Sequence, residues 1–152
     1  MLARSSGRIR IMAAPVVPTM LAAGRRGAFA FLLRLVTDPA GTPNEAAYFW
    51  TAGALSAFLD NAPTYLVFFE LAGGDPQALT GPLAGTLAAI SMGAVYMGAL
   101  TYIGNAPNLM IYAIAMERGV KMPSFFGYMV WSGAVMLPVL ALLTLLFVAP
   151  PW

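Results

Sequence analysis

Two short polar sequences, each inside an otherwise apolar stretch, hold the side chains most capable of chemistry. They are Asp60-Asn61-Ala62-Pro63-Thr64 and Gly104-Asn105-Ala106-Pro107-Asn108, whose first asparagines lie 44 residues apart. In both, Asn precedes an Ala-Pro pair that opens a new helix, so each Asn is predicted to be a helix N-cap. A helix broken within a bilayer offers free carbonyl groups to a cation and a positive N-terminus to an anion. The pair therefore predicts one ion-binding site at mid-depth in a membrane.

Six residues of these breaks are assigned to the predicted site. Asp60 is expected to bind the cation or a proton, because an acid within apolar sequence is costly unless it functions. Gly104 is expected to let backbone carbonyls approach closely. The others would supply side-chain oxygens: Asn61, Thr64, Asn105 and Asn108. A bound Na⁺ would take ligands from Asp60, Asn61 and Asn105.

Other kinds of chemistry are excluded by what the sequence lacks. The chain has no cysteine and no histidine, which removes disulfides, thiol nucleophiles, imidazole metal sites and Ser-His catalysis. A single acid within apolar sequence does not make an acid–base pair. We therefore expect no enzyme and no cofactor, with Na⁺ and H⁺ as transported or coupling ions. The net charge of +2 is too small for a nucleic-acid footprint.

The composition is that of a membrane protein. Of 152 residues, 60% are hydrophobic and 9% are charged, and the mean hydropathy is +0.77. Soluble domains have about a quarter of their residues charged, so this chain could not cover a soluble surface. We expect an all-α, multi-pass integral membrane protein whose residues 1–152 form one membrane domain in a lipid bilayer.

Five segments follow from the breaks and from the lengths of the apolar runs. They are a short or truncated transmembrane segment (1–23), an interfacial arm (24–44), a re-entrant hairpin (45–71), a broken transmembrane helix (76–117) and a terminal transmembrane helix (123–149). The basic, proline-interrupted start also has the outline of a signal peptide. Thr42, Pro43 and Glu45 predict a capping box that starts the hairpin. Each arm of that hairpin is too short to cross a hydrocarbon core about 30 Å thick.

Small and hydroxyl residues add two further expectations. Four small residues recur at every fourth position and predict a face for close helix packing: Gly81, Gly85, Ala89 and Gly93. Gly98 would extend this face. Ser56, Thr51 and Thr101 could line the site, although isolated hydroxyls usually bond back to their own helix.

Three longer motifs carry a resemblance to a known family. They are SAFLDNAPTY (56–65), YIGNAPN (102–108) and MPSFFGYM (122–129). From about residue 10 onward, the chain resembles the C-terminal part of the citrate-transporter-like family, often labelled sodium:proton antiporters, in the ion transporter superfamily. The resemblance implies two inverted repeats, each with a re-entrant hairpin and an unwound helix, around a substrate and Na⁺ site. It also implies residence in a bacterial inner membrane.

Members of that family are longer, so this chain resembles the second repeat, half of an inverted-repeat transporter. It would then need its N-terminal repeat or a second copy, as in a homodimer. Related carriers have a Ser-Asn-Thr signature at the hairpin tips, whereas here Asp60 precedes Asn61 and Gly104 precedes Asn105.

The sequence favours a secondary active transporter, with Na⁺/H⁺ antiport as the main expectation. Na⁺- or H⁺-coupled transport of citrate or another carboxylate is the alternative, because two helix N-termini suit an anion. A non-transporting membrane subunit or a truncated remnant is a second alternative, since one repeat does not obviously close a pathway.

Overall fold

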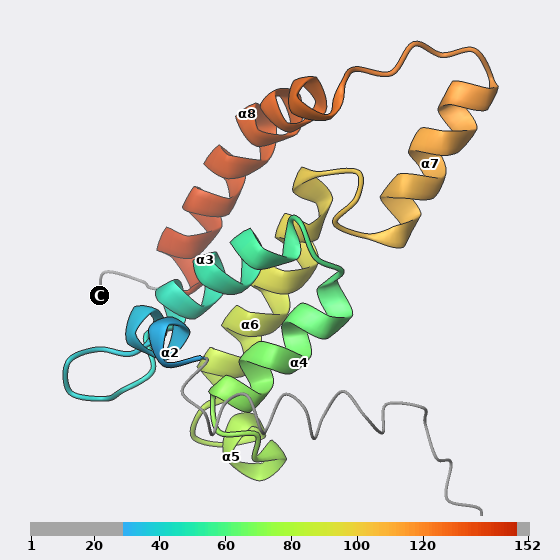
Figure 1. The fold of residues 1–152 in the computed structure, drawn as a ribbon. Coiled ribbons are helices and arrows are strands. Elements are labelled where there is room, and N and C mark those ends of the chain that lie inside the picture. The colour runs from blue at the N-terminus through green and yellow to red at the C-terminus, as the bar shows by residue number, and fades with distance from the viewer. Residues whose placement is uncertain (1–28, 149–152) are drawn as a thin grey trace, which may run out of the picture.

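The computed structural model describes residues 29–148, and their regular structure is almost entirely helical (Figure 1). The helices are α2 (Ala30–Val36), α3 (Glu45–Ser56), α4 (Asn61–Leu71), α5 (Pro76–Thr80), α6 (Ala84–Met97), α7 (Ala106–Glu117) and α8 (Phe125–Leu143). A 3₁₀ turn, η1 (Gly98–Leu100), extends α6, and a π-helical turn, η2 (Thr144–Val148), extends α8. The all-α prediction is thus confirmed for this range. The predicted segment 1–23 and the start of the arm 24–44 lie outside the described residues.

Helices α3 and α4 form an antiparallel hairpin (Figure 1). Near its open end the rings of Tyr48 and Phe68 meet edge to face, with centroids 6.2 Å apart. The arms have 12 and 11 residues, so at about 1.5 Å per residue neither approaches the roughly 30 Å of a hydrocarbon core. The hairpin has the dimensions of a re-entrant element, and its entry into a membrane stays a prediction.

The start of α3 differs from the predicted capping box. Asn44 is the N-cap, and its side-chain oxygen accepts a hydrogen bond from the N–H of Ala47 at 3.0 Å. Pro43 is outside the helix, in an isolated antiparallel bridge with Thr37. The capping role of Thr42 was therefore wrong, because a stronger capping residue stands two positions later, next to the first helical residue.

Helix α6 packs along α3 in the same direction, through points where a glycine leaves room for the neighbouring helix. A Cβ atom added at these glycines would collide with the facing residue: Gly85 with Glu45, Gly93 with Phe49 and, from α3, Gly53 with Met97. The small-residue face is thus confirmed at Gly85 and Gly93, and Ala89 between them is fully buried. Two of these contacts pair residues 44 positions apart, the offset that separates the two Asn-Ala-Pro sequences.

Gly81 does not belong to this face. It follows α5, in a turn that interrupts the segment before α6 begins, and its Cβ position lies 2.9 Å from the carbonyl oxygen of Gln77 in the same turn. Pro82 explains this unexpected break, because proline donates no backbone hydrogen bond and disfavours helical geometry at the residue before it.

Helix α8 and its extension η2 cover 24 residues, Phe125–Val148, with a mean hydropathy of 2.2. Among residues 29–148 this is the one helix long and apolar enough to cross a membrane, and α6 with η1 is a shorter apolar helix. The helix begins two residues later than predicted, because Ser124 is its N-cap and accepts a hydrogen bond from Gly127 at 3.3 Å.

Helix α7 lies apart from the hairpin, and none of its residues is buried (Figure 1). An aromatic cluster connects it to α8. Tyr102 stacks on Tyr112 of α7 with centroids 4.2 Å apart, and meets Phe125 and Tyr128 of α8 edge-on at 5.5 and 5.6 Å. The position of α7 therefore depends on aromatic packing between Tyr112 in its middle, the ring of Tyr102 and the first turn of α8.

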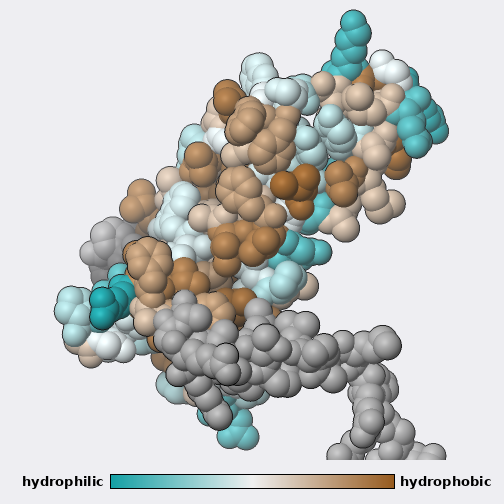
Figure 2. Space-filling view, in the orientation of Figure 1, coloured by the Kyte–Doolittle hydropathy of each residue, from teal (hydrophilic) through white to brown (hydrophobic). Residues whose placement is uncertain are grey.

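Large apolar side chains remain uncovered on the outer faces of α7 and α8. On α8, Phe126, Val130 and Trp131 are each more than 70% exposed. Figure 2 shows hydrophobic residues over most of the visible face, with hydrophilic residues gathered mainly toward the two ends. Exposed apolar surface of this extent indicates a lipid or protein environment rather than water.

Candidate functional site

The first break is the tip of the α3–α4 hairpin. Asp60 takes the N-cap position of α4 with an extended ψ of 145°, but its side chain is exposed and makes no capping hydrogen bond. Asn61 is consequently the first residue of α4, so the prediction that Asn61 is the N-cap was wrong. The residue with extended backbone lies one position earlier, and Asp is as good a capping type as Asn.

Thr64, in the first turn of α4, carries a hydroxyl without a partner. The residue is 1% exposed, and its Oγ1 has no hydrogen bond within the described part of the chain. The carbonyl of Asp60 accepts the N–H of Thr64, and the hydroxyl does not share that carbonyl, whereas the hydroxyls of Ser91 and Thr144 do bond four residues back. A buried, unpaired hydroxyl is destabilising by about 1–3 kcal/mol, which makes Thr64 a group able to bind a ligand.

The second break separates α6 and η1 from α7. Asn105 has extended backbone and is the N-cap of α7, with its Oδ1 accepting a hydrogen bond from the N–H of Asn108 at 2.9 Å. The predicted capping role of Asn105 is confirmed. Asn108 takes part through its backbone, while its own side chain is half-buried.

The two breaks come together in space. The hydroxyl of Thr101 donates to the carbonyl of Ala57 at the end of α3, and accepts a hydrogen bond from the N–H of Gly104 at 2.9 Å. Ser56 reinforces the junction by donating its hydroxyl to the carbonyl of Ala94 on α6. Both hydroxyls therefore bond across to another element, contrary to the expectation that they bond within their own helices.

Gly104 lies where backbone carbonyls from both breaks converge. A Cβ atom there would collide with the carbonyl oxygen of Gly98 and would lie 2.9 and 3.0 Å from those of Ala57 and Ser56. Three carbonyl oxygens thus lie around the Cα of Gly104, in space that is open only because glycine has a hydrogen atom where other residues have a Cβ. The prediction that Gly104 admits close carbonyl approach agrees with this geometry.

The remaining predicted residues are not joined by direct bonds. Within residues 29–148 no hydrogen bond links the side chain of Asp60 or Asn61 to the second break, and no group of three acidic side chains lies close enough to hold a metal. Sequence reasoning underrated three residues of this junction: Ser56, Thr101 and Gly98. Thr101 bonds to Ala57 at the repeat offset of 44, but Ser56 bonds to Ala94 across 38 residues, so no single sequence signal identifies them.

The junction lies within the length of the apolar helix α8. The hydroxyl of Ser132 donates to the carbonyl of Leu100 in η1 at 2.5 Å. At about 1.5 Å per residue, Ser132 lies about 10 Å from the Phe125 end of this helix and about 24 Å from the Val148 end. Helix α3 of the hairpin also contacts η2. If α8 crosses a membrane, Leu100 lies at the depth of Ser132, nearer to the Phe125 end of the helix than to its middle.

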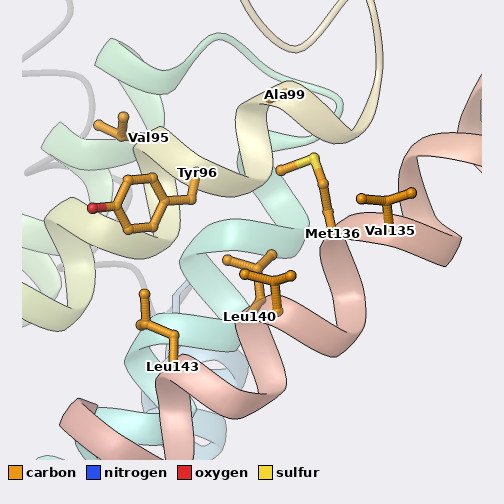
Figure 3. Close-up of a pocket in the computed structure, with 8 residues that line it drawn as sticks. Val95, Tyr96, Ala99, Val135, Met136, Leu140 and Leu143 are labelled. Carbon is orange, nitrogen blue, oxygen red and sulfur yellow. The ribbon is translucent and has the colours of Figure 1, made fainter.

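A separate cavity of about 470 Å³ lies between α6 and α8, and Figure 3 shows its side chains converging from both helices. It is lined by apolar residues and by Tyr96: Val95, Ala99, Val135, Met136, Val139, Leu140 and Leu143. Such a lining offers almost no donor to a polar ion, so the junction of the breaks is the better candidate site.

Comparison with known families agrees with the motif resemblance. A family described as “Putative citrate transport” matches residues 7–148. The chain belongs to this family. Membership in the citrate-transport family, with the apolar helix α8, indicates a membrane transport protein and favours the carboxylate alternative over Na⁺/H⁺ antiport. No curated protein and no solved structure matches the chain.

Proposed function

We propose that the protein transports citrate or a related carboxylate across a membrane, coupled to Na⁺ or H⁺. The observation that carries this proposal is the junction of the two breaks, where three backbone carbonyls converge on Gly104, next to the N-cap of α7 and beside an apolar helix. Membership in the citrate-transport family supports the choice of substrate class.

The coupling cation would bind near Gly104. Sodium prefers oxygen ligands, and the carbonyls of Ser56, Ala57 and Gly98 already converge there from both breaks. Asp60 and Asn61 begin the neighbouring helix and remain proposed ligands together with Asn105. Protonation of Asp60 would be the alternative way to couple transport to H⁺.

The carboxylate would bind at the N-terminus of α7, with α4 nearby. Helix α7 has 12 residues, and its free N–H groups and dipole favour a negative group at that end. The side-chain NH₂ group of Asn105 supplies a donor there, while its oxygen accepts the capping hydrogen bond. The unpaired hydroxyl of Thr64 is a further donor at the start of α4.

The protein would reside in a bacterial inner membrane with several membrane-entering segments, the α3–α4 hairpin among them. A second repeat or a second copy would supply the opposite wall of the pathway and cover Asp60, which is exposed here.

The test is uptake of labelled citrate into vesicles that contain the purified protein, driven by a Na⁺ gradient or by a pH gradient. Asn105→Asp keeps a capping oxygen but replaces the amide donor with a negative charge, so uptake should fall at least about tenfold. Ser124→Asp is the matched control, because Ser124 is the N-cap of α8, is exposed, and is replaced by an equally good capping residue that adds the same negative charge. It should transport normally.

Two outcomes would refute this function. Wild-type vesicles that take up no citrate or other di- or tricarboxylate under either gradient would exclude carboxylate transport. Dissipation of a pH gradient by Na⁺ in the absence of any carboxylate would instead establish the antiport that the sequence first suggested.

A further inference from the structure

We infer that Thr101 is the positioning residue of the site, and that its single hydroxyl sets the spacing between the two breaks. The transport consequence of this inference rests on the proposed function, whereas its structural part does not. Thr101 lies outside α6, η1 and α7, and is fully buried. Because no helix fixes Thr101, its side chain is held in place by the hydrogen bonds of its hydroxyl and by the packing around it.

Both bonding capacities of that hydroxyl are used, and each reaches a different break. It donates to the carbonyl of Ala57, one of the carbonyls at the C-terminus of α3 for which the helix provides no N–H partner. It accepts from the N–H of Gly104, which stands in a stretch without regular secondary structure. The hydroxyl therefore gives a hydrogen-bond partner to one backbone group at each break: the carbonyl of Ala57 after α3 and the N–H of Gly104 before α7.

The same two bonds orient the carbonyls around Gly104. Holding the N–H of Gly104 fixes the glycine beside Ala57, and the donor on Ala57 fixes the direction of that carbonyl. A substitution that removes the hydroxyl leaves a buried N–H and a buried carbonyl unpaired in one step. The hairpin tip and the loop before α7 are then expected to separate until water or lipid headgroups reach these groups.

The first experiment measures the spacing directly. Because the chain has no cysteine, Leu59→Cys and Ile103→Cys, which replace exposed residues on either side of the junction, can carry the only two spin labels. Because each label lies two residues from the bonded pair Ala57 and Thr101, dipolar broadening in continuous-wave electron paramagnetic resonance, which suits short separations, should give a narrow distance distribution, which Thr101→Val should broaden or shift. Thr101→Ser should restore it, since serine keeps the hydroxyl.

A matched control distinguishes this role from the loss of any buried hydroxyl. Thr144 is also buried, but its hydroxyl donates to Leu140 within its own helix, so Thr144→Val should leave the distance unchanged. An unchanged distribution in Thr101→Val, or an equal change in Thr144→Val, would overturn the inference. If Thr101→Val does not insert, amide exchange of Gly104 in the wild-type protein decides: slow exchange is expected, and exchange as fast as that of Ile103 would refute the bond.

The second readout concerns transport. Thr101→Val should raise the Na⁺ concentration for half-maximal citrate uptake about tenfold, with a smaller change in the maximal rate, and Thr101→Ser should reverse this. A shifted distance in a protein that transports no citrate would refute the proposed function and leave the positioning role intact. Citrate transport with an unshifted distance and an unchanged Na⁺ requirement would refute the positioning role alone.

Discussion

Replacing Gly93 with alanine tests whether α3 and α6 pack at backbone contact. The added Cβ would overlap the carbonyl oxygen of Phe49 and would lie 3.0 and 3.1 Å from its carbonyl carbon and Cα. These are backbone atoms inside a helix, so rotation of a side chain cannot relieve the contact. The two helices must move apart, which also loosens the neighbouring contacts of Ala52, Ala89 and Ile90, all fully buried.

The expected loss of stability follows from two opposing effects. Inserting a methyl group into a packed core costs about 1–3 kcal/mol, and backbone contact favours the upper part of that range. Alanine regains up to about 1 kcal/mol of helix propensity over glycine. The net loss is therefore about 2 kcal/mol, which corresponds to a fall in Tm of about 4–8 °C for a chain of this size.

Thermal unfolding of the purified protein in detergent, followed by tryptophan fluorescence, measures this change. Gly133→Ala is the matched control, because Gly133 is also helical but its Cβ position meets only the side chain of Leu137, at 3.7 Å. That variant should be as stable as wild type or slightly more stable. If Gly93→Ala unfolds at the same temperature as Gly133→Ala, the close approach of α3 and α6 is refuted.

Three further predictions concern the junction, α7 and the outer face of α8. Gly104→Ala should reduce citrate uptake at least about tenfold while the protein is retained in the membrane, because three carbonyls occupy the space of its Cβ; uptake at the wild-type rate would contradict this. Tyr102→Ala should speed amide exchange throughout α7 about tenfold, whereas Tyr102→Phe keeps the ring contacts and should not; equal exchange in the two variants would count against the aromatic cluster. In single-tryptophan variants, brominated lipids should quench Trp131, which is 74% exposed on α8, more strongly than the half-buried Trp50; equal quenching would place the outer face of α8 away from lipid.

The helices and their breaks could be predicted because each depends on local sequence. An Asn-Ala-Pro sequence interrupts one helix and starts the next, because asparagine caps the N-terminus and proline fits the first turn. The cap at Asn105 was predicted on this basis. The same reasoning failed where two possible capping residues lay within two positions of each other. Local preference does not decide between Asp60 and Asn61, or between Thr42 and Asn44, since each member of a pair can adopt the extended backbone that a cap requires.

The junction itself could be predicted only in part. The matching breaks indicated that both ends would contribute, and close approach at Gly104 was expected from its lack of a side chain. The hydroxyl bonds of Ser56 and Thr101 were missed, because a single serine or threonine gives no indication whether its partner is four residues away or, as here, 38 and 44 residues away. Only the packing of α3 against α6 in register determines that choice.

The arrangement of short and long helices has a consequence for biosynthesis. A translocon selects membrane segments largely by their hydropathy as they leave the ribosome, and among residues 29–148 the segment that meets this requirement unaided is Phe125–Val148, the last to be made. The hairpin and α6 are synthesised before this helix. Their stable insertion is therefore expected to depend on α8 or on contact with another part of the protein, rather than on their own hydropathy.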